Sequence, residues 1–228
     1  MNISELFKEN FYSFTVMLGK SPRGAGMFFD TPSLAASSGE AGADENYVLF
    51  GPRSAVSDVA AAARFFREHR TGFTAPLIDG MPDGFEDAFY IHGMKQHKTY
   101  TSMYLPKSFL LRSHGAANAV KISQPMRARA WAQAVWLGFG GGRDDKELES
   151  YKNFGEYLAS NEANEAFALI EDGVFAATAL LHYSPNATGL YYFATRPEMR
   201  RRGCATRLLD SLCPIMARRG LPMVLLAT

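Results

Sequence analysis

The chain has 228 residues, of which 47% are hydrophobic and 21% are charged, and its formal net charge is +1. That balance is typical of a soluble globular protein with one large domain or two small ones. The near-neutral charge argues against a protein that coats nucleic acid, since such proteins usually carry a basic surplus.

The cysteines and the first residues favour a cytoplasmic protein that does not bind membranes. Cys204 and Cys213 lie about 13 Å apart along one predicted helix, too far for a disulfide, and free thiols fit a reducing compartment. The sequence does not start with a basic segment followed by an apolar run, and no stretch approaches the roughly 18 apolar residues of a membrane span.

The first half of the chain predicts short strands alternating with short helices. Ser57 with Asp58 predicts the start of a helix that stops at Gly72. Small, polar and glycine-bearing residues at 33–46 predict a loop. Aromatic and β-branched residues predict the strands. The predicted strands are 11–18, 47–50, 73–78 and 99–105, and a second short helix is predicted at 85–93.

The second half predicts a more regular α+β domain after a connection at 106–118. Turn residues after Glu171 and Tyr183 separate three strands, which predicts an antiparallel meander. Asp144 and Glu147 have the spacing of a capping box. In chain order we predict a strand at 119–125, helices at 127–139 and 144–158, strands at 166–173, 174–183 and 188–195, a helix at 203–219 and a buried strand at 222–228.

The sequence RPEMRRRGCATRLL at 196–209 places three arginines directly before a predicted helix. The free N–H groups of a first helical turn, together with the helix dipole, form a site for an anion. Arg200, Arg201 and Arg202 add charge-assisted donors suited to a diphosphate, and Gly203 lets a phosphate approach the backbone. The alternative is a solvated basic turn, but arginine at that end of a helix opposes the dipole. We therefore favour anion binding.

The order strand, Pro-Glu, Arg-x-x-Gly-x-Ala, helix and buried strand resembles the acyl-CoA-binding signature of the GNAT N-acetyltransferase superfamily. The family pattern falls on Arg200, Gly203 and Ala205, and the elements before it follow the family order over residues 118–228. The resemblance implies an α+β fold, in which helices flank a mixed, mostly antiparallel central sheet.

The resemblance also implies a reaction and a binding site. The protein would transfer an acetyl group from acetyl-CoA to an amine of a small molecule or peptide by direct attack, without a metal. A strand amide would stabilise the oxyanion, and an acid would protonate the leaving thiolate. The implied CoA-binding residues are Phe193, Ala194 and Thr195 along the pantetheine arm, and Arg200, Arg201, Arg202, Gly203, Cys204, Ala205 and Thr206 around the diphosphate.

The sequence assigns no catalytic residue. Many family members carry a glutamate on the strand before the motif, whereas the strand at 188–195 holds no acid. Tyr191, Tyr192, His182 and Glu165 are candidates for the base, although a buried strand tyrosine usually serves packing.

A tyrosine helix and further strands follow the buried strand in the family, whereas this sequence ends at Thr228. Residues 89–94 and the strand after them resemble that helix end, which makes Tyr90 a candidate acid. We predict a degenerate GNAT-like α/β half at 1–115 and an acyl-CoA-binding domain at 116–228. The first half would cover the last strand's edge or wall the acceptor pocket, and the alternative is an independent subdomain at 1–105. An uncovered edge would instead favour a homodimer.

Two other functions are weighed against catalysis. A non-catalytic CoA-binding or regulatory module is the alternative, because the expected acid and last strands are missing. A third function is a module that uses the arginines to bind RNA or an anion other than acyl-CoA, and the near-neutral charge argues against it. His92 and His97 have no nearby cysteine or second acidic ligand, so we predict no metal site.

Overall fold

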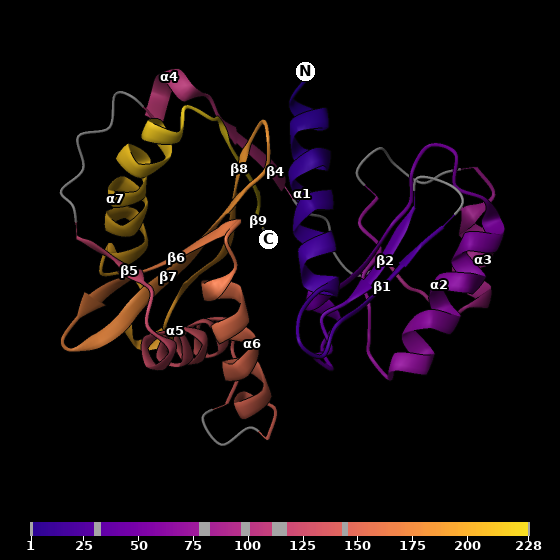
Figure 1. The fold of residues 1–228 in the computed structure, drawn as a ribbon, viewed down its shortest axis with the longest axis horizontal. Coiled ribbons are helices and arrows are strands. Elements are labelled where there is room, and N and C mark those ends of the chain that lie inside the picture. Colours follow the sequence, from indigo (N-terminus) through magenta and orange to yellow (C-terminus); the bar gives the residue numbers. More distant parts are fainter. Residues whose placement is uncertain are drawn as a thin grey trace. The chain divides into compact units, whose positions relative to one another are not determined.

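The computed structural model describes residues 2–29, 33–77, 83–96, 101–110, 118–142 and 146–227 (Figure 1). The chain forms two compact units. The larger unit contains Met1–Asn10 and Tyr100–Thr228, and the smaller unit contains Phe11–Thr99. The domain boundary predicted between residues 115 and 116 stays a prediction.

The larger unit is built on a six-stranded sheet with the order β4-β9-β8-β7-β6-β5. Every neighbouring pair is antiparallel except β8 and β9, which are parallel. The mixed, mostly antiparallel sheet and the meander of three strands are therefore confirmed. The strands are β4 (Thr101–Leu105), β5 (Ala119–Ile122), β6 (Asn164–Glu171), β7 (Val174–Tyr183), β8 (Thr188–Thr195) and β9 (Met223–Ala227).

Helices flank this sheet, as expected (Figure 1). Helix α7 (Cys204–Arg219) buries Leu208, Leu212 and Met216 at intervals of four residues, so one apolar stripe packs against the sheet. The Trp131 side chain on α5 is fully buried, and its indole N–H donates to the carbonyl of Phe167 on β6 at 3.0 Å. The other helices of this unit are α4 (Lys107–Leu110), α5 (Pro125–Gly138) and α6 (Leu148–Ser160).

Strand β4 pairs with β9 and covers the edge of that strand. Thr101 lies opposite Ala227 and Leu105 opposite Met223, in antiparallel register. The expectation that a segment from the first half of the chain covers the last strand is confirmed. The argument for a homodimer through an uncovered β9 edge does not apply, because β4 occupies that edge.

The smaller unit contains a three-stranded antiparallel sheet with the order β1-β2-β3. Buried Val48, Phe65 and Phe66 form one of its apolar clusters. The elements are β1 (Ala25–Phe28), β2 (Leu34–Ser37), η1 (Ala43–Glu45), β3 (Asn46–Leu49), α2 (Val56–His69) and α3 (Phe85–Ile91). The predicted strand at 47–50 and the predicted helix at 85–93 match β3 and α3.

The predicted strand at 11–18 is wrong, because these residues belong to helix α1 (Ile3–Gly19). Asn2 and Glu5 form a reciprocal capping box, in which each side chain accepts a 2.8 Å hydrogen bond from the other's backbone N–H. Buried apolar residues recur at helical spacing along α1, which is the physical reason for a helix. They are Phe7, Phe11, Phe14 and Leu18.

The predicted loop at 33–46 is also wrong in its first part. Residues Leu34–Ser37 form the central strand β2, and all four are buried. Strand β2 is paired on both sides, with β1 and with β3. The start of α2 also differs, since Ala55 is the N-cap and Ser57 lies inside the helix. A strand was also predicted at 73–78. Among the described residues of that range, Thr74 makes one isolated β-bridge, to Tyr47.

The boundaries in the second half agree more closely with the sequence. Gly203 and Gly220 cap α7 at its two ends, both in the left-handed conformation. The predicted capping box of Asp144 and Glu147 cannot be compared in full, since Asp144 lies outside the described residues. Glu147 is the N-cap of α6. No helix within the described residues is long and apolar enough to cross a membrane.

Candidate functional site

Strands β8 and β9 are paired over a short stretch and then separate. Only Thr188 with Met223 and Gly189 with Val224 are register partners. Beyond Gly189, β8 remains paired with β7 and β9 remains paired with β4. The β9-facing edge of β8 is therefore left without a strand partner from residue 190 to Thr195, within the described part of the sheet. Phe193, Ala194 and Thr195 lie on this edge.

A bulge redirects β8 just before those three residues. The register between β7 and β8 shifts between Thr178 and Leu180, and Tyr192 has a left-handed φ of 48°. The Thr178 hydroxyl donates to the Tyr192 carbonyl at 3.0 Å, and the Tyr192 ring meets Trp131 edge-on at 6.0 Å between centroids. Bulges of this kind bend a strand and change the direction of its backbone groups.

The arginine loop, which we define as residues 196–203, joins β8 to α7. It contains the short helix η2 (Pro197–Met199) and two left-handed residues, Arg201 (φ 61°) and Gly203 (φ 72°). Among the described residues, no carbonyl accepts a hydrogen bond from the amides of residues 201–206, and the first amide of α7 with an acceptor is that of Arg207. Alternation of left- and right-handed residues forms a concave nest of N–H groups that suits an anion.

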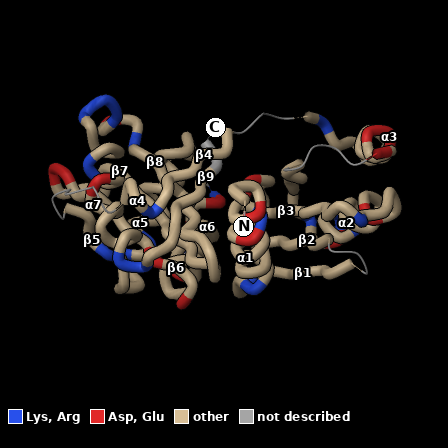
Figure 2. Tube along the Cα trace, turned by 90° about the horizontal axis from the view of Figure 1, so that it is seen from above, with Lys and Arg blue, Asp and Glu red and all other residues tan. Residues whose placement is uncertain are grey.

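Four of the five arginines around this loop already have protein partners. Figure 2 colours the lysine and arginine positions blue along the Cα trace. The Arg202 guanidinium lies 3.4 Å from the Asp172 carboxylate, and Arg207 is paired with Glu171. Arg196 is 2.5 Å from Glu198, and Arg200 donates to two backbone carbonyls. Arg201 is exposed, and no described residue pairs with its side chain.

Carboxylates of the β6–β7 turn lie against the arginine loop. Hydrogen bonds from Arg207 and Cys204 lower the pKa of Glu171, so it stays ionised. Sequence reasoning treated Glu171-Asp172-Gly173 only as a turn. Its acidic side chains next to an arginine run could have indicated this contact, but the pairing depends on how β6 and β7 meet α7.

The structure brings the ten predicted CoA-binding residues together in one continuous segment from the end of β8 to the first turn of α7. Arg200, Arg201, Arg202, Gly203 and Thr206 are exposed, whereas Cys204 is buried. The Cys204 thiol lies 3.4 Å from the Glu171 carboxylate. A Cβ added to Gly203 would meet no atom within 4 Å, which leaves open space above the backbone.

The Arg200 contacts were not predicted. Its Nη2 donates to the Gly138 carbonyl at 2.8 Å, and its Nε donates to the Thr195 carbonyl at 3.2 Å. Gly138 is the last residue of α5 and Thr195 the last residue of β8. The guanidinium thus joins two element ends.

His182 and Tyr191, two candidates for the catalytic base, belong to a buried polar network. His182 is fully buried, and its Nδ1 lies 2.8 Å from the Asn164 Oδ1. Burial lowers the pKa of His182 to about 4, so the imidazole is neutral at pH 7. Burial raises the pKa of Tyr191, whose hydroxyl donates to Asn10 at 2.9 Å.

Glu165, a further candidate for the base, and Tyr90, the candidate acid, lie in other surroundings. Burial alone would raise the pKa of Glu165, but hydrogen bonds from Lys121 and Tyr183 outweigh it and the pKa is lowered. Glu165 also lies 3.7 Å from Arg219, at the end of α7 opposite the arginine loop. Tyr90, on α3 of the smaller unit, is 84% exposed.

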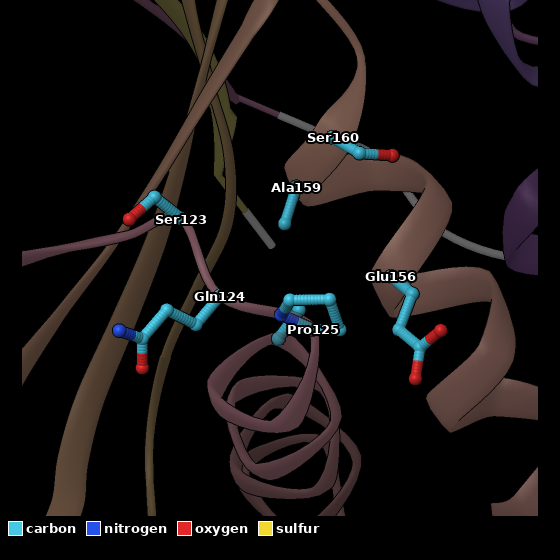
Figure 3. Close-up of a pocket in the computed structure, with 7 residues that line it drawn as sticks. Ser123, Gln124, Pro125, Glu156, Ala159 and Ser160 are labelled. Atoms are coloured by element: carbon cyan, nitrogen blue, oxygen red, sulfur yellow. The ribbon is translucent and has the colours of Figure 1, made fainter.

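A separate small pocket of about 150 Å³ lies where α5 begins and α6 ends (Figure 3). Because α5 ends at Gly138, the pocket lies at the other end of this 14-residue helix. The Glu156 carboxylate in it accepts a 3.2 Å hydrogen bond from Arg129. The pocket is lined by Ser123, Gln124, Pro125, Ala128, Glu156, Ala159 and Ser160. In the part of the chain that the structure describes, no cluster of His, Cys, Asp or Glu could hold a metal ion.

Residues 128–228 match the model of the acetyltransferase (GNAT) family. No curated protein matches the sequence.

Solved structures with a similar fold extend over nearly the whole chain. A GCN5-related N-acetyltransferase from Kribbella flavida is 16% identical, with 99% of this chain and 86% of that chain covered and a TM-score of 0.66. A functionally unknown conserved protein from Staphylococcus epidermidis is 9% identical, with 90% and 83% covered and a TM-score of 0.61. A tandem GNAT protein from the clavulanic acid biosynthesis pathway is 13% identical, with 99% and 87% covered and a TM-score of 0.55. At these identities the likeness shows the fold alone, while the family match assigns residues 128–228 to the acetyltransferase (GNAT) family.

Proposed function

We propose that this protein transfers an acetyl group from acetyl-CoA to an amine of a small molecule or peptide. The family implies acyl transfer from acyl-CoA; the acetyl donor and the amine acceptor are our proposal. The observation that carries it is the run of unpaired amides at residues 201–206, which lies next to the unpaired edge of β8.

The arginine loop and the first turn of α7 suit the diphosphate of CoA. The amides of residues 201–206 would donate to its oxygens, and the dipole of the 16-residue helix α7 favours negative charge there. Arg201 would supply the cation, because Arg202 and Arg207 are already paired with carboxylates. Cys204, Ala205 and Thr206 would contribute through their backbone.

The unpaired edge of β8 suits the pantetheine arm. Its amide groups resemble those of a peptide strand, so they can pair with the backbone of Phe193, Ala194 and Thr195. The bulge at Tyr192 would then set the direction of a backbone amide toward the thioester carbonyl oxygen.

The chemical step would be direct attack. The neutral amine nitrogen forms a bond to the thioester carbonyl carbon, the carbon–sulfur bond breaks, and CoA leaves as a thiolate that takes up a proton. The amine must lose its proton to a base or to water, and we assign neither the base nor the acid. Both cysteines are free thiols, which supports a reducing, cytoplasmic setting for the reaction.

A matched pair of substitutions at Gly203 tests the donor site by calorimetry with acetyl-CoA. Asparagine and aspartate both tolerate the left-handed backbone, so Gly203→Asn and Gly203→Asp differ mainly in charge. We expect micromolar binding by the unsubstituted protein and affinity at least about tenfold weaker for Gly203→Asp than for Gly203→Asn. Equal affinities for the two variants would contradict a diphosphate at this helix end.

A thiol-release assay with acetyl-CoA and a mixed amine library tests the reaction itself. Release that depends on an amine and is lost in Gly203→Asp supports the transferase. Binding without release supports the second candidate, a non-catalytic CoA-binding module. The burial of His182 and Tyr191 favours that alternative, since neither is poised as a base.

A further inference from the structure

We infer that Arg200 is a positioning residue, which ties the arginine loop and the end of β8 to the end of α5. The expected effect on acetyl-CoA binding rests on the proposed function. The hydrogen bonds by which Arg200 joins these elements do not depend on it. Arg200 would thereby make binding at the arginine loop affect the glycine-rich turn that follows α5, residues 139–142.

The Arg200 guanidinium bridges two backbone carbonyls. It donates to the carbonyls of Gly138 and Thr195, at 2.8 and 3.2 Å. The carbonyls at the end of a helix have no helical partner and carry partial negative charge, so a cation there is favourable. The planar fork of arginine can bridge two such oxygens, which a lysine ammonium on a flexible stem does less well.

The end of α5 and the end of β8 also touch directly. A Cβ placed on Gly138 would lie 2.7 Å from the Ala194 Cβ and 3.5 Å from the Thr195 amide nitrogen. The end of α5 therefore lies against the β8 residues proposed to pair with pantetheine. A shift of α5 would be transmitted to Ala194 and Thr195, because packed atoms at this distance leave no free space.

The turn after α5 is held by its own hydrogen bonds. The amides of Phe139, Gly140 and Gly141 donate to the carbonyls of residues 135, 137 and 136 at 2.9–3.2 Å. The Trp136 indole donates to the Gly142 carbonyl at 3.0 Å. The position of this turn therefore follows the end of α5, which Arg200 holds.

Hydrogen exchange of the free protein tests, without any ligand, whether Arg200 holds the end of α5. We expect the amides of residues 139–141 to exchange about tenfold faster in Arg200→Gln than in the unsubstituted protein, because a charge-assisted hydrogen bond at the helix end is lost. Arg200→Lys should restore part of this protection. Arg201→Gly is the matched control, since it removes a neighbouring arginine that has no described partner and should leave the exchange unchanged.

Acetyl-CoA titrations of the same proteins separate positioning from direct contact. If Arg200 acts through the two carbonyls, its glutamine variant keeps the salt dependence of acetyl-CoA binding but loses the added protection of residues 139–141 on binding. Arg201→Gly should do the opposite, with a weaker salt dependence and the added protection retained.

Unchanged exchange in free Arg200→Gln would overturn the inference. So would equal loss of salt dependence in Arg200→Gln and Arg201→Gly, which would mean that both arginines contact the diphosphate. Failure of the unsubstituted protein to bind acetyl-CoA would instead refute the proposed function, and the exchange of the free protein would still decide whether Arg200 holds α5.

Discussion

The hydroxyl of Tyr191 donates a hydrogen bond to the Oδ1 of Asn10 at 2.9 Å, across 181 positions of the chain. The side-chain nitrogen of Asn10, Nδ2, donates in turn to the carbonyls of His182 and Ala187, at 3.1 and 3.2 Å. Asn10 is fully buried. The first turns of α1 are thus joined to the turn between β7 and β8, close to the point where β8 leaves β9.

Asn10→Ala should destabilise the larger unit by about 2 kcal/mol, because it removes the buried hydrogen bonds that the Asn10 side chain makes with the Tyr191 hydroxyl and two carbonyls. Urea unfolding followed through the tryptophans, both of which lie on α5, would report the lower midpoint. Glu9→Ala is the control, since Glu9 bonds Asn186 at the surface. A midpoint for Asn10→Ala equal to that of Glu9→Ala would contradict the role of this network.

Burial of His182 predicts a pH dependence of stability. Its pKa is lowered from 6.5 to about 4, so below pH 6.5 the unfolded chain takes up a proton that the folded protein does not. Stability is therefore complete above pH 6.5 and falls toward pH 4, by on the order of 3 kcal/mol in total. The difference in unfolding free energy between the unsubstituted protein and His182→Gln should shrink over this window. Parallel curves for the two proteins would show that His182 titrates normally.

Because Gly138 lies close to Ala194, we expect the substitution Gly138→Ala to lower the stability of the protein. Gly138→Ala would ordinarily stabilise a helix, but here its Cβ meets the Ala194 Cβ at 2.7 Å, and overpacking should cost about 1–3 kcal/mol. Gly142→Ala is the control, because an added Cβ meets no atom within 4 Å there. In thermal unfolding, adding Ala194→Gly should restore the stability that Gly138→Ala loses. A double variant as unstable as Gly138→Ala alone would exclude this contact as the cause.

The elements of the second half could be predicted because each has its own local signal. The turn at Asp172 and Gly173 separates two strands, and the stripe of Leu208, Leu212 and Met216 specifies the buried face of α7. The family resemblance placed Phe193, Ala194 and Thr195 along the pantetheine arm, and the bulge at Tyr192 adds a feature with no sequence signal.

The wrong predictions for the first half of the chain, a strand at 11–18 and a loop at 33–46, have physical causes. Residues 11–18 are rich in aromatic residues, which favour a strand locally, and the helical spacing becomes visible only when Phe7 is included with Phe11 and Phe14. Strand β2 is made of small residues whose burial depends on the neighbouring strands, so tertiary context decides it.

The bond between Arg200 and Gly138 spans 62 positions and ends on a backbone carbonyl. Any residue type could present such a carbonyl, so no pattern of residue types marks this partner. Pairing of this kind becomes apparent only once α5 and β8 are packed together.

The ion pair between Arg202 and Asp172 predicts a variant that binds acetyl-CoA more tightly. Asp172 lies in the left-handed turn (φ 52°), which asparagine also tolerates, so Asp172→Asn removes the charge and preserves the turn. The freed Arg202 would be available to the diphosphate, and the nearby negative charge would be gone. Because both side chains are largely exposed, we expect only about a twofold to threefold gain in affinity at low salt.

Calorimetry at two salt concentrations checks this prediction. The gain should disappear at high ionic strength, where exposed charges are screened. Glu149→Gln on α6, which pairs with Arg129, makes the same change in net charge and should leave the affinity unchanged. Weaker binding by Asp172→Asn would mean that Asp172 holds Arg202 in a productive position, so that the turn between β6 and β7 supports the donor site and does not compete with it.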